Sequence, residues 1–300
     1  MRWRLVLGVV AFVLWAPAGL VGLPCAALLL AAPHAAPRTR LLGGLLAGVS
    51  FGLLALTSHG RLAGVIAAYA VLTTAAFVTG ALLAPAGFLR QALRAMTAAG
   101  MATALLVREL WGPGGWDAVA WEATRQAGGA MRLVVAYSPD AFALYEPVVR
   151  FVSATTPGML VLQTLAGLAL AWQLHTQLAA TPLGPPLAPF REFRLADGWV
   201  WGVVAWLGLL VAPVSSALKL AGANIGFVVG TLYVLRGAAV VVAFAQAIGI
   251  SAVALVIAAS VAAALALPLL FLVPGLCTLG ITDTWYEYRR RLAAGRPNAT

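Results

Sequence analysis

Arg236 is the side chain best placed to do chemistry, because it lies near the middle of an otherwise apolar run, 224–249. A guanidinium at that depth in a membrane is costly and usually faces a cavity or a partner. It could bind an anionic ligand, or form an internal ion pair with Asp283 or Asp197. The alternative is a tilted helix that brings Arg236 close to an interface.

Two further polar side chains extend this candidate site. Asn224 stands at the mouth of the same run, where it could line a pocket or simply cap the helix. Gln163 lies one turn inside another apolar run, 157–179, and could also line a pocket. Arg236, Asn224 and Gln163 are therefore the candidate substrate-binding residues.

The sequence offers little for catalysis. Gly48-Val-Ser50-Phe-Gly52 matches the G-x-S-x-G pattern of hydrolase nucleophiles, but that pattern works at a strand-to-helix turn and here lies in an apolar helical run. HExxH, P-loop and paired intramembrane acids are absent from the sequence. Cys25 and Cys277 lie in apolar segments at opposite ends, which predicts neither a disulfide framework nor a metal site. We expect a protein that is not an enzyme, with no catalytic residue, metal or cofactor.

The composition indicates that these residues are positioned by membrane helices. Of 300 residues, 62% are hydrophobic and 9% are charged, with a mean hydropathy of +0.96, whereas a soluble domain carries about 25% charged residues. The apolar runs are long enough to cross a bilayer and do not alternate with polar residues as barrel strands do. The net charge of +10 then fits arginines at helix ends facing anionic headgroups, and not nucleic acid.

The apolar runs predict an all-α polytopic bundle with six to eight transmembrane helices. Prolines interrupt the first and last runs, so each could be one bent helix or a hairpin, and the parity of crossings depends on them. The runs are 5–32, 41–57, 62–84, 86–110, 157–179, 199–218, 224–249 and 250–281.

The middle of the chain is less apolar, and it suggests two amphipathic helices lying along the membrane surface, 117–137 and a second one opening at Ser138-Pro139-Asp140. We therefore divide one membrane domain into N-terminal transmembrane helices, interfacial helices and C-terminal transmembrane helices with a basic tail. Their ranges are 1–110, 111–156 and 157–300. The loop 181–186 offers the only plausible boundary.

Two series of glycines recur every fourth residue on predicted helices. Small residues at that spacing let helix backbones approach closely, which indicates either packing within the chain or a surface for a partner. The two series are Gly44, Gly48 and Gly52, and Gly222, Gly226 and Gly230.

Charged and aromatic residues bracket the last apolar runs. They could be interfacial charges with aromatic anchors, or docking points for a cytoplasmic partner. Basic residues at both ends of the chain predict that both termini are cytoplasmic. The candidate interface residues are Arg191, Glu192, Arg194, Asp283 and Trp285.

Four stretches of the C-terminal half serve as landmarks: Pro157-Gly-Met-Leu, Pro189-Phe-Arg-Glu-Phe-Arg-Leu, Tyr233-Val-Leu-Arg-Gly237 and Leu279-Gly-Ile-Thr-Asp-Thr-Trp. Together they resemble the YybS-like family of predicted bacterial membrane proteins, a domain of unknown function. Ala196 stands where that family usually has proline. The family is similar to the substrate-binding membrane subunits of energy-coupling-factor transporters.

The resemblance implies a multi-pass protein of the bacterial inner (cytoplasmic) membrane. It suggests a transporter substrate-binding subunit, with the lipid bilayer and energising membrane proteins as partners. The alternative is a non-transporting membrane scaffold or envelope-assembly factor that recruits scaffold partners.

Overall fold

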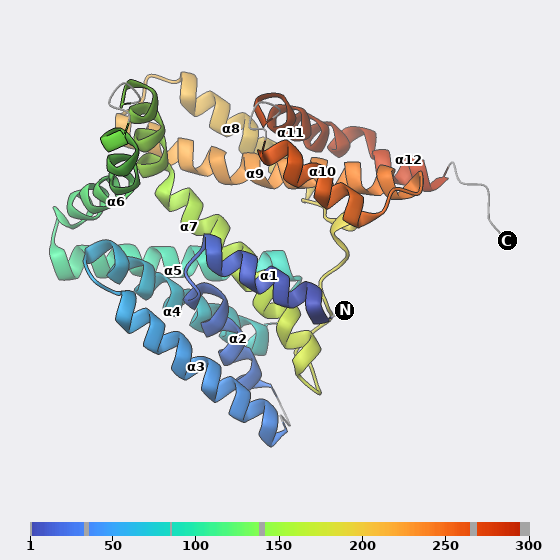
Figure 1. The fold of residues 1–300 in the computed structure, drawn as a ribbon, viewed down its shortest axis with the longest axis horizontal. Helices are drawn as coiled ribbons and strands as arrows, with labels where there is room; N and C mark the ends of the chain where they lie inside the picture. Colours follow the sequence, from blue (N-terminus) through green and yellow to red (C-terminus); the bar gives the residue numbers. More distant parts are fainter. Residues whose placement is uncertain (1, 33–35, 85, 138–141, 265–268, 295–300) are drawn as a thin grey trace. The chain divides into compact units, whose positions relative to one another are not determined.

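The computed structural model describes residues 2–32, 36–84, 86–137, 142–264 and 269–294. Every regular element in these ranges is a helix (Figure 1), so the all-α fold class is confirmed. The chain divides into two compact units, Met1–Leu187 and Ala188–Thr300. The boundaries expected near residues 110 and 156 both lie inside unit 1. The expected cap at Ser138-Pro139-Asp140 lies outside the described residues.

Unit 1 is built around α2, which contacts α3, α4 and α7. Nine of its thirteen residues are buried. Gly167 lets α7 approach this helix, because a Cβ there would lie 3.0 Å from the carbonyl carbon of Leu20. The helices of unit 1 are α1 (Arg2–Trp15), α2 (Gly19–Ala31), α3 (Pro37–Thr57), α4 (Arg61–Leu83), α5 (Phe88–Trp111), α6 (Gly115–Tyr137) and α7 (Phe142–Leu178).

The first apolar run forms two separate helices and not one bent helix. α1 ends at Trp15 and α2 begins at Gly19, so Pro17 lies in the break between them. Pro24 is accommodated within α2. Pro24 lies beyond the first turn, so α2 continues through it although the backbone bond to the carbonyl of Leu20 is lost.

α7 corrects the prediction that a helix begins at Pro157. The helix runs continuously from Phe142 to Leu178 with Pro157 inside it. Thr155 and Thr156 each donate a hydroxyl hydrogen bond to a backbone carbonyl four residues earlier, at 2.8 and 3.0 Å. These hydroxyls bond the carbonyls of Phe151 and Val152 in the turn before Pro157, whereas the N–H that proline lacks would have bonded the carbonyl of Ser153. Membrane helices commonly tolerate such an internal proline.

α6 packs against the protein on one side. Its Glu122 is buried and accepts a hydrogen bond from the backbone N–H of Leu62 at 3.0 Å, which caps the first turn of α4. Val119 and Ala123 of the same helix join a buried cluster with Val107. α6, which was expected to lie along the membrane surface, therefore also has a face that packs against α4 and α5.

Unit 2 is organised by α9, which packs against α8 and α11. α9 begins earlier than the predicted start at residue 224, because Ser215 caps it by accepting from the N–H of Leu218 at 3.4 Å. Of the two prolines that interrupt the last apolar run, Pro268 lies outside the described residues and Pro274 lies inside the last long helix of this unit. The elements are the 3-10 turns η2 (Phe190–Glu192) and η3 (Asp197–Trp199), then α8 (Val200–Val211), α9 (Ser216–Ala247), α10 (Ala252–Ala264), α11 (Leu269–Tyr286) and α12 (Tyr288–Ala294).

The two glycine series differ in what they contact. A Cβ at Gly222 or Gly226 would overlap Leu209 or Trp206 of α8, so these glycines admit α8 side chains against α9. A Cβ at Gly230 would meet no described atom within 4 Å, and the same holds for all of Gly44, Gly48 and Gly52 on α3. Packing within the described chain therefore accounts for Gly222 and Gly226 but not for the α3 series.

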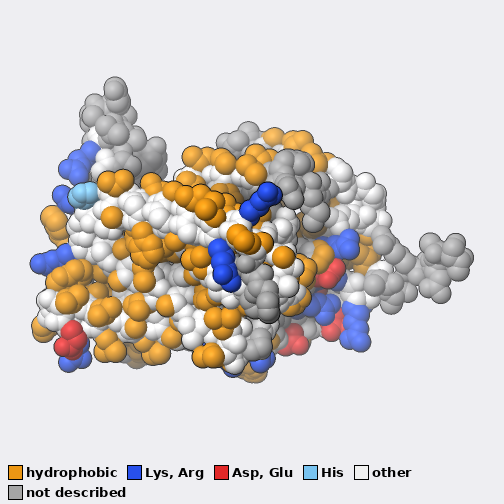
Figure 2. All heavy atoms as spheres, turned by 90° about the horizontal axis from the view of Figure 1, so that it is seen from below, with side chains coloured by type: hydrophobic (Ala, Val, Ile, Leu, Met, Phe, Trp, Pro, Cys, Tyr) orange, Lys and Arg blue, Asp and Glu red, His pale blue; other side chains and the backbone are white. Residues whose placement is uncertain are grey.

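Four of the described helices are long and apolar enough to cross a membrane, by length and composition. They are Pro37–Thr57, Arg61–Leu83, Glu146–Leu178 and Ser216–Ala247. Shorter apolar helices accompany them, so the total of six to eight crossings stays a prediction. Figure 2 shows hydrophobic side chains spread over the visible face with few charges among them, as a lipid-facing surface requires.

α9 and α11 cross so closely that two glycines are required. A Cβ on Gly280 would overlap the backbone oxygen of Tyr233, and a Cβ on Gly237 would overlap that of Leu276. We predict that Gly280→Ala lowers the free energy of unfolding by about 1–3 kcal/mol, because backbone atoms cannot rotate away from the added methyl. Thermal unfolding of the full chain in detergent measures this.

Gly275→Ala on the same helix is the matched control, because a Cβ there meets open space. It should leave the unfolding midpoint unchanged or raise it slightly, since alanine favours a helix over glycine. Equal effects of the two substitutions would contradict the close crossing.

Candidate functional site: a buried arginine–aspartate cluster

Arg236 forms a buried ion pair with Asp283, where α9 crosses α11. Its Nε donates to the Asp283 Oδ2 at 3.1 Å, and the Arg289 Nη2 donates to the same oxygen at 2.8 Å. The side chains of Arg236, Asp283 and Arg289 are 4%, 1% and 8% exposed. We call these three residues the buried charge cluster. The tilted-helix alternative for Arg236 is therefore not needed.

Arg289 reaches the cluster because the chain bends sharply between α11 and α12. Glu287 adopts a left-handed conformation at φ 45°, which costs a non-glycine residue about 1–2 kcal/mol. The bend turns Arg289 back toward Asp283, six residues earlier. A strained residue at this position indicates that the contacts made by Arg289 outweigh the cost of the bend.

The cluster also holds the segment that leads into unit 2. The Arg289 Nη1 donates to the backbone carbonyls of Arg191 and Phe193, both at 2.9 Å. The Arg236 Nη1 donates to the carbonyl of Leu195 at 3.3 Å. These bonds satisfy carbonyls in a stretch with only short 3-10 turns, which a buried or membrane-bordering segment needs.

The cluster carries more positive than negative charge. Two guanidinium groups share one carboxylate, and a buried ion pair is stable only when its remaining donors and acceptors are also bonded. The backbone carbonyls of the 191–195 segment accept hydrogen bonds from some of the remaining guanidinium donors. The Asp283 Oδ1 and the Arg289 Nε still have no partner among the described atoms. A bound anion or water would offset this imbalance.

The other two candidate ligand residues bond to the chain itself. Asn224 lies within α9 and not at its mouth, and its Nδ2 donates to the Leu220 carbonyl at 3.0 Å. Ser215, and not Asn224, caps the N-terminus of α9. The Gln163 Nε2 donates to the carbonyl of Trp15 at 2.9 Å, which joins α7 to the end of α1. Asn224 and Arg236 are twelve residues apart on α9, about 18 Å along the helix, so they do not form one site, and Gln163 belongs to unit 1.

Three of the five candidate interface residues line an open groove. Arg191, Glu192 and Arg194 line it together with Gln246 and Arg289, and its volume is about 380 Å³. We call this the arginine groove. Trp285 is 63% exposed and does not line it.

Within the groove, the Arg191 Nη1 donates to the Gln246 Oε1 at 3.3 Å, and its Nε lies 3.6 Å from the Glu192 Oε1. Arg194 is exposed.

Sequence reasoning missed Arg289, which it treated only as part of the basic tail. The missing signal was the bend at Glu287, because a residue six positions along a continuous helix would not face Asp283. His175, at the end of the apolar run 157–179, was not among the candidate residues either. The structure buries His175 completely, with its Nε2 accepting from the backbone N–H of Leu183 at 3.1 Å.

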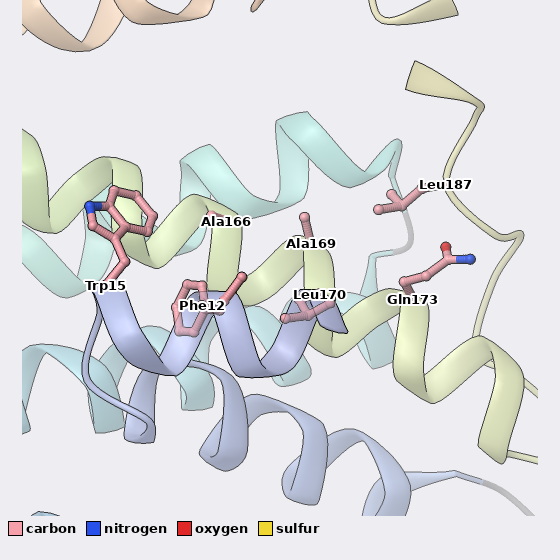
Figure 3. Close-up of a pocket in the computed structure, with 9 residues that line it drawn as sticks. Phe12, Trp15, Ala166, Ala169, Leu170, Gln173 and Leu187 are labelled. Carbon is pink, nitrogen blue, oxygen red and sulfur yellow. The ribbon is translucent and has the colours of Figure 1, made fainter. Parts of the chain in front are cut away.

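Unit 1 also contains an apolar groove between α1 and α7 (Figure 3). Its volume is about 650 Å³, and Phe12, Trp15 and Leu170 are among the side chains lining it. Gln173 adds a polar group at one end, and its Oε1 is buried without a described partner. Mostly apolar lining with few polar groups is typical of small-molecule sites.

The helical fold and its long apolar helices define an all-α protein of the lipid bilayer. A family model described as Predicted membrane protein (DUF2232) matches residues 143–284, from α7 into α11. The chain is therefore similar to an uncharacterised family of membrane proteins over a range that includes Arg236 and Asp283 but not Arg289. No curated protein and no solved structure matches the chain.

We predict that Arg289→Ala releases the 191–195 segment, because two carbonyls and Asp283 lose their donor. Trypsin should then cleave the folded chain in detergent after Arg191 or Arg194 about tenfold faster, which corresponds to losing about 1.4 kcal/mol of local stability. Arg290→Ala is the control, since Arg290 is exposed and, among the described residues, forms an ion pair only with Glu287. Equal cleavage rates in both variants would contradict this role.

Proposed function

We propose that the chain is a non-enzymatic membrane scaffold that holds a partner membrane protein against the outer face of α3. The observation that carries this proposal is the open glycine series Gly44, Gly48 and Gly52, where an added Cβ would meet no described atom. It is supported by the polar candidates Arg236, Asn224 and Gln163, which all bond to the chain itself.

α3 stands apart from the other long helices in its exposure. Only 11% of its most apolar window is buried, compared with 44% for α4. Leu45 and Val49 flank the glycines and are about 60% exposed. Lipid tails pack equally well against bulky side chains and against glycine. A second helix, in contrast, can approach the α3 backbone more closely where the residues are small. A glycine face with apolar flanks therefore suits a second helix better than lipid.

The charge at the start of α3 indicates the kind of helix that would dock there. Arg38 and Arg40 are both exposed at this end. A second copy of α3 lying parallel would bring these like charges together, which is unfavourable. We therefore expect a transmembrane helix of a different protein, with small residues on its facing side and an acidic residue near the end that meets Arg38 and Arg40.

A substrate-binding subunit of a bacterial inner-membrane transporter, with both termini cytoplasmic, is the second candidate. It is favoured by the α1–α7 groove of unit 1 (Figure 3), where the Gln173 Oε1 could accept a hydrogen bond from a mostly apolar ligand. Energy would then come from partner proteins, since the sequence has no P-loop.

A photo-crosslinker in place of Leu45 tests the scaffold proposal in native membranes. We expect an adduct with another protein, mapped by peptide sequencing to a transmembrane helix with a terminal acidic residue. Gly48→Leu should reduce the adduct at least about fivefold, because overpacking a helix interface costs about 1–3 kcal/mol. Gly100→Leu is the control, since Gly100 on α5 also has open space around it.

Adducts with lipid alone, or an adduct that is equally strong in Gly48→Leu, would contradict the scaffold proposal. The transporter candidate instead predicts that a small molecule co-purifies with the wild-type chain and is lost from Leu170→Trp, which fills the α1–α7 groove.

A further inference from the structure

We infer that the arginine groove of unit 2 binds the phosphate group of an anionic membrane lipid. This site is independent of α3 and therefore of the scaffold proposal. The groove has three guanidinium groups, from Arg191, Arg194 and Arg289, and a single carboxylate, from Glu192. A planar guanidinium donates two parallel hydrogen bonds to phosphate oxygens, which makes arginine the preferred side chain for such anions.

The buried charge cluster gives the groove a fixed positive end. Arg289 lines the groove while being held by Asp283 and by two backbone carbonyls. Its position therefore does not depend on a ligand, and it loses little conformational freedom when an anion arrives. Behind it, Arg236 adds a second buried positive charge that Asp283 alone must balance. An anion in the groove would relieve this excess.

Arg194 is the side chain most available to a ligand. It is exposed, and it makes no hydrogen bond or ion pair within the part of the chain that the structure describes. Arg191 is partly engaged, because its Nε lies 3.6 Å from the Glu192 Oε1 in an exposed pair. Such exposed pairs contribute little stability, so a phosphate could displace the Glu192 carboxylate.

The location of the groove favours a lipid over a soluble phosphate. Gln246, which lines it, lies at the end of the candidate membrane span Ser216–Ala247. Headgroups occupy this level of a bilayer. Trp285 and Tyr286 are exposed at the adjacent end of α11, as aromatic residues are at a membrane interface. Leu292 also lines the groove and offers an apolar contact to the glycerol region.

Calorimetric titration of the full chain in a neutral detergent tests this inference. The probes are short-chain dioctanoyl phosphatidylglycerol, the matching phosphatidylcholine and inorganic phosphate, all at one ionic strength because salt screens exposed charges. We expect saturable binding of phosphatidylglycerol, and at least tenfold weaker binding of the other two.

Three variants separate the groove from general surface charge. Arg194→Gln should weaken phosphatidylglycerol binding about tenfold, as expected for the loss of one charge-assisted hydrogen bond. Glu192→Gln should tighten it about threefold, because a competing carboxylate is removed. Arg290→Gln is the control, with the same change of charge on an exposed side chain outside the groove, and should change binding less than twofold. Unaltered unfolding midpoints would show that all three variants fold.

Equal weakening by Arg194→Gln and Arg290→Gln would overturn the inference in favour of diffuse electrostatic attraction. Inorganic phosphate that binds as tightly as phosphatidylglycerol would overturn the lipid assignment. Binding that does not saturate would remove the site altogether.

Discussion

The burial of one carboxylate between two guanidinium groups is the constraint on which unit 2 depends. Asp283 is 1% exposed and accepts from both Arg236 and Arg289. Each charge would be very costly in a membrane without the others, so α9, α11 and the bend before α12 must come together as a set. The close crossing at Gly237 and Gly280 makes this possible, because it brings the helix backbones near enough for the short aspartate to reach Arg236.

The fold class followed from the sequence because a bilayer leaves few alternatives. Long apolar runs without alternation can only be helices, and the structure describes helices throughout. The helix ends were less predictable. Pro157 suggested a start, yet α7 continues through it, because a membrane helix that packs against neighbouring helices tolerates the loss of one backbone bond. Proline is thus a weaker boundary signal in a membrane than in water.

The site was only partly predictable, for a geometric reason. A lone arginine among apolar residues must find a counter-charge, which singled out Asp283 and Asp197, and the structure pairs Arg236 with Asp283. Arg289 could not be found this way, since a left-handed Glu287 redirects the chain. The glycine spacing likewise indicated close approach, but spacing alone does not distinguish Gly226, which admits Trp206, from Gly48, which faces open space.

A double-mutant cycle between Arg236 and Asp283 tests the central claim most directly. Unfolding free energies would be measured in detergent for Arg236→Met, Asp283→Leu and the double variant. The account predicts that each single change is destabilising by about 3–5 kcal/mol, because it leaves a buried charge unpaired. The double variant should lose less than the sum of both, with a coupling energy of about 1–3 kcal/mol. Free energies that add within about 0.5 kcal/mol would contradict the buried pair.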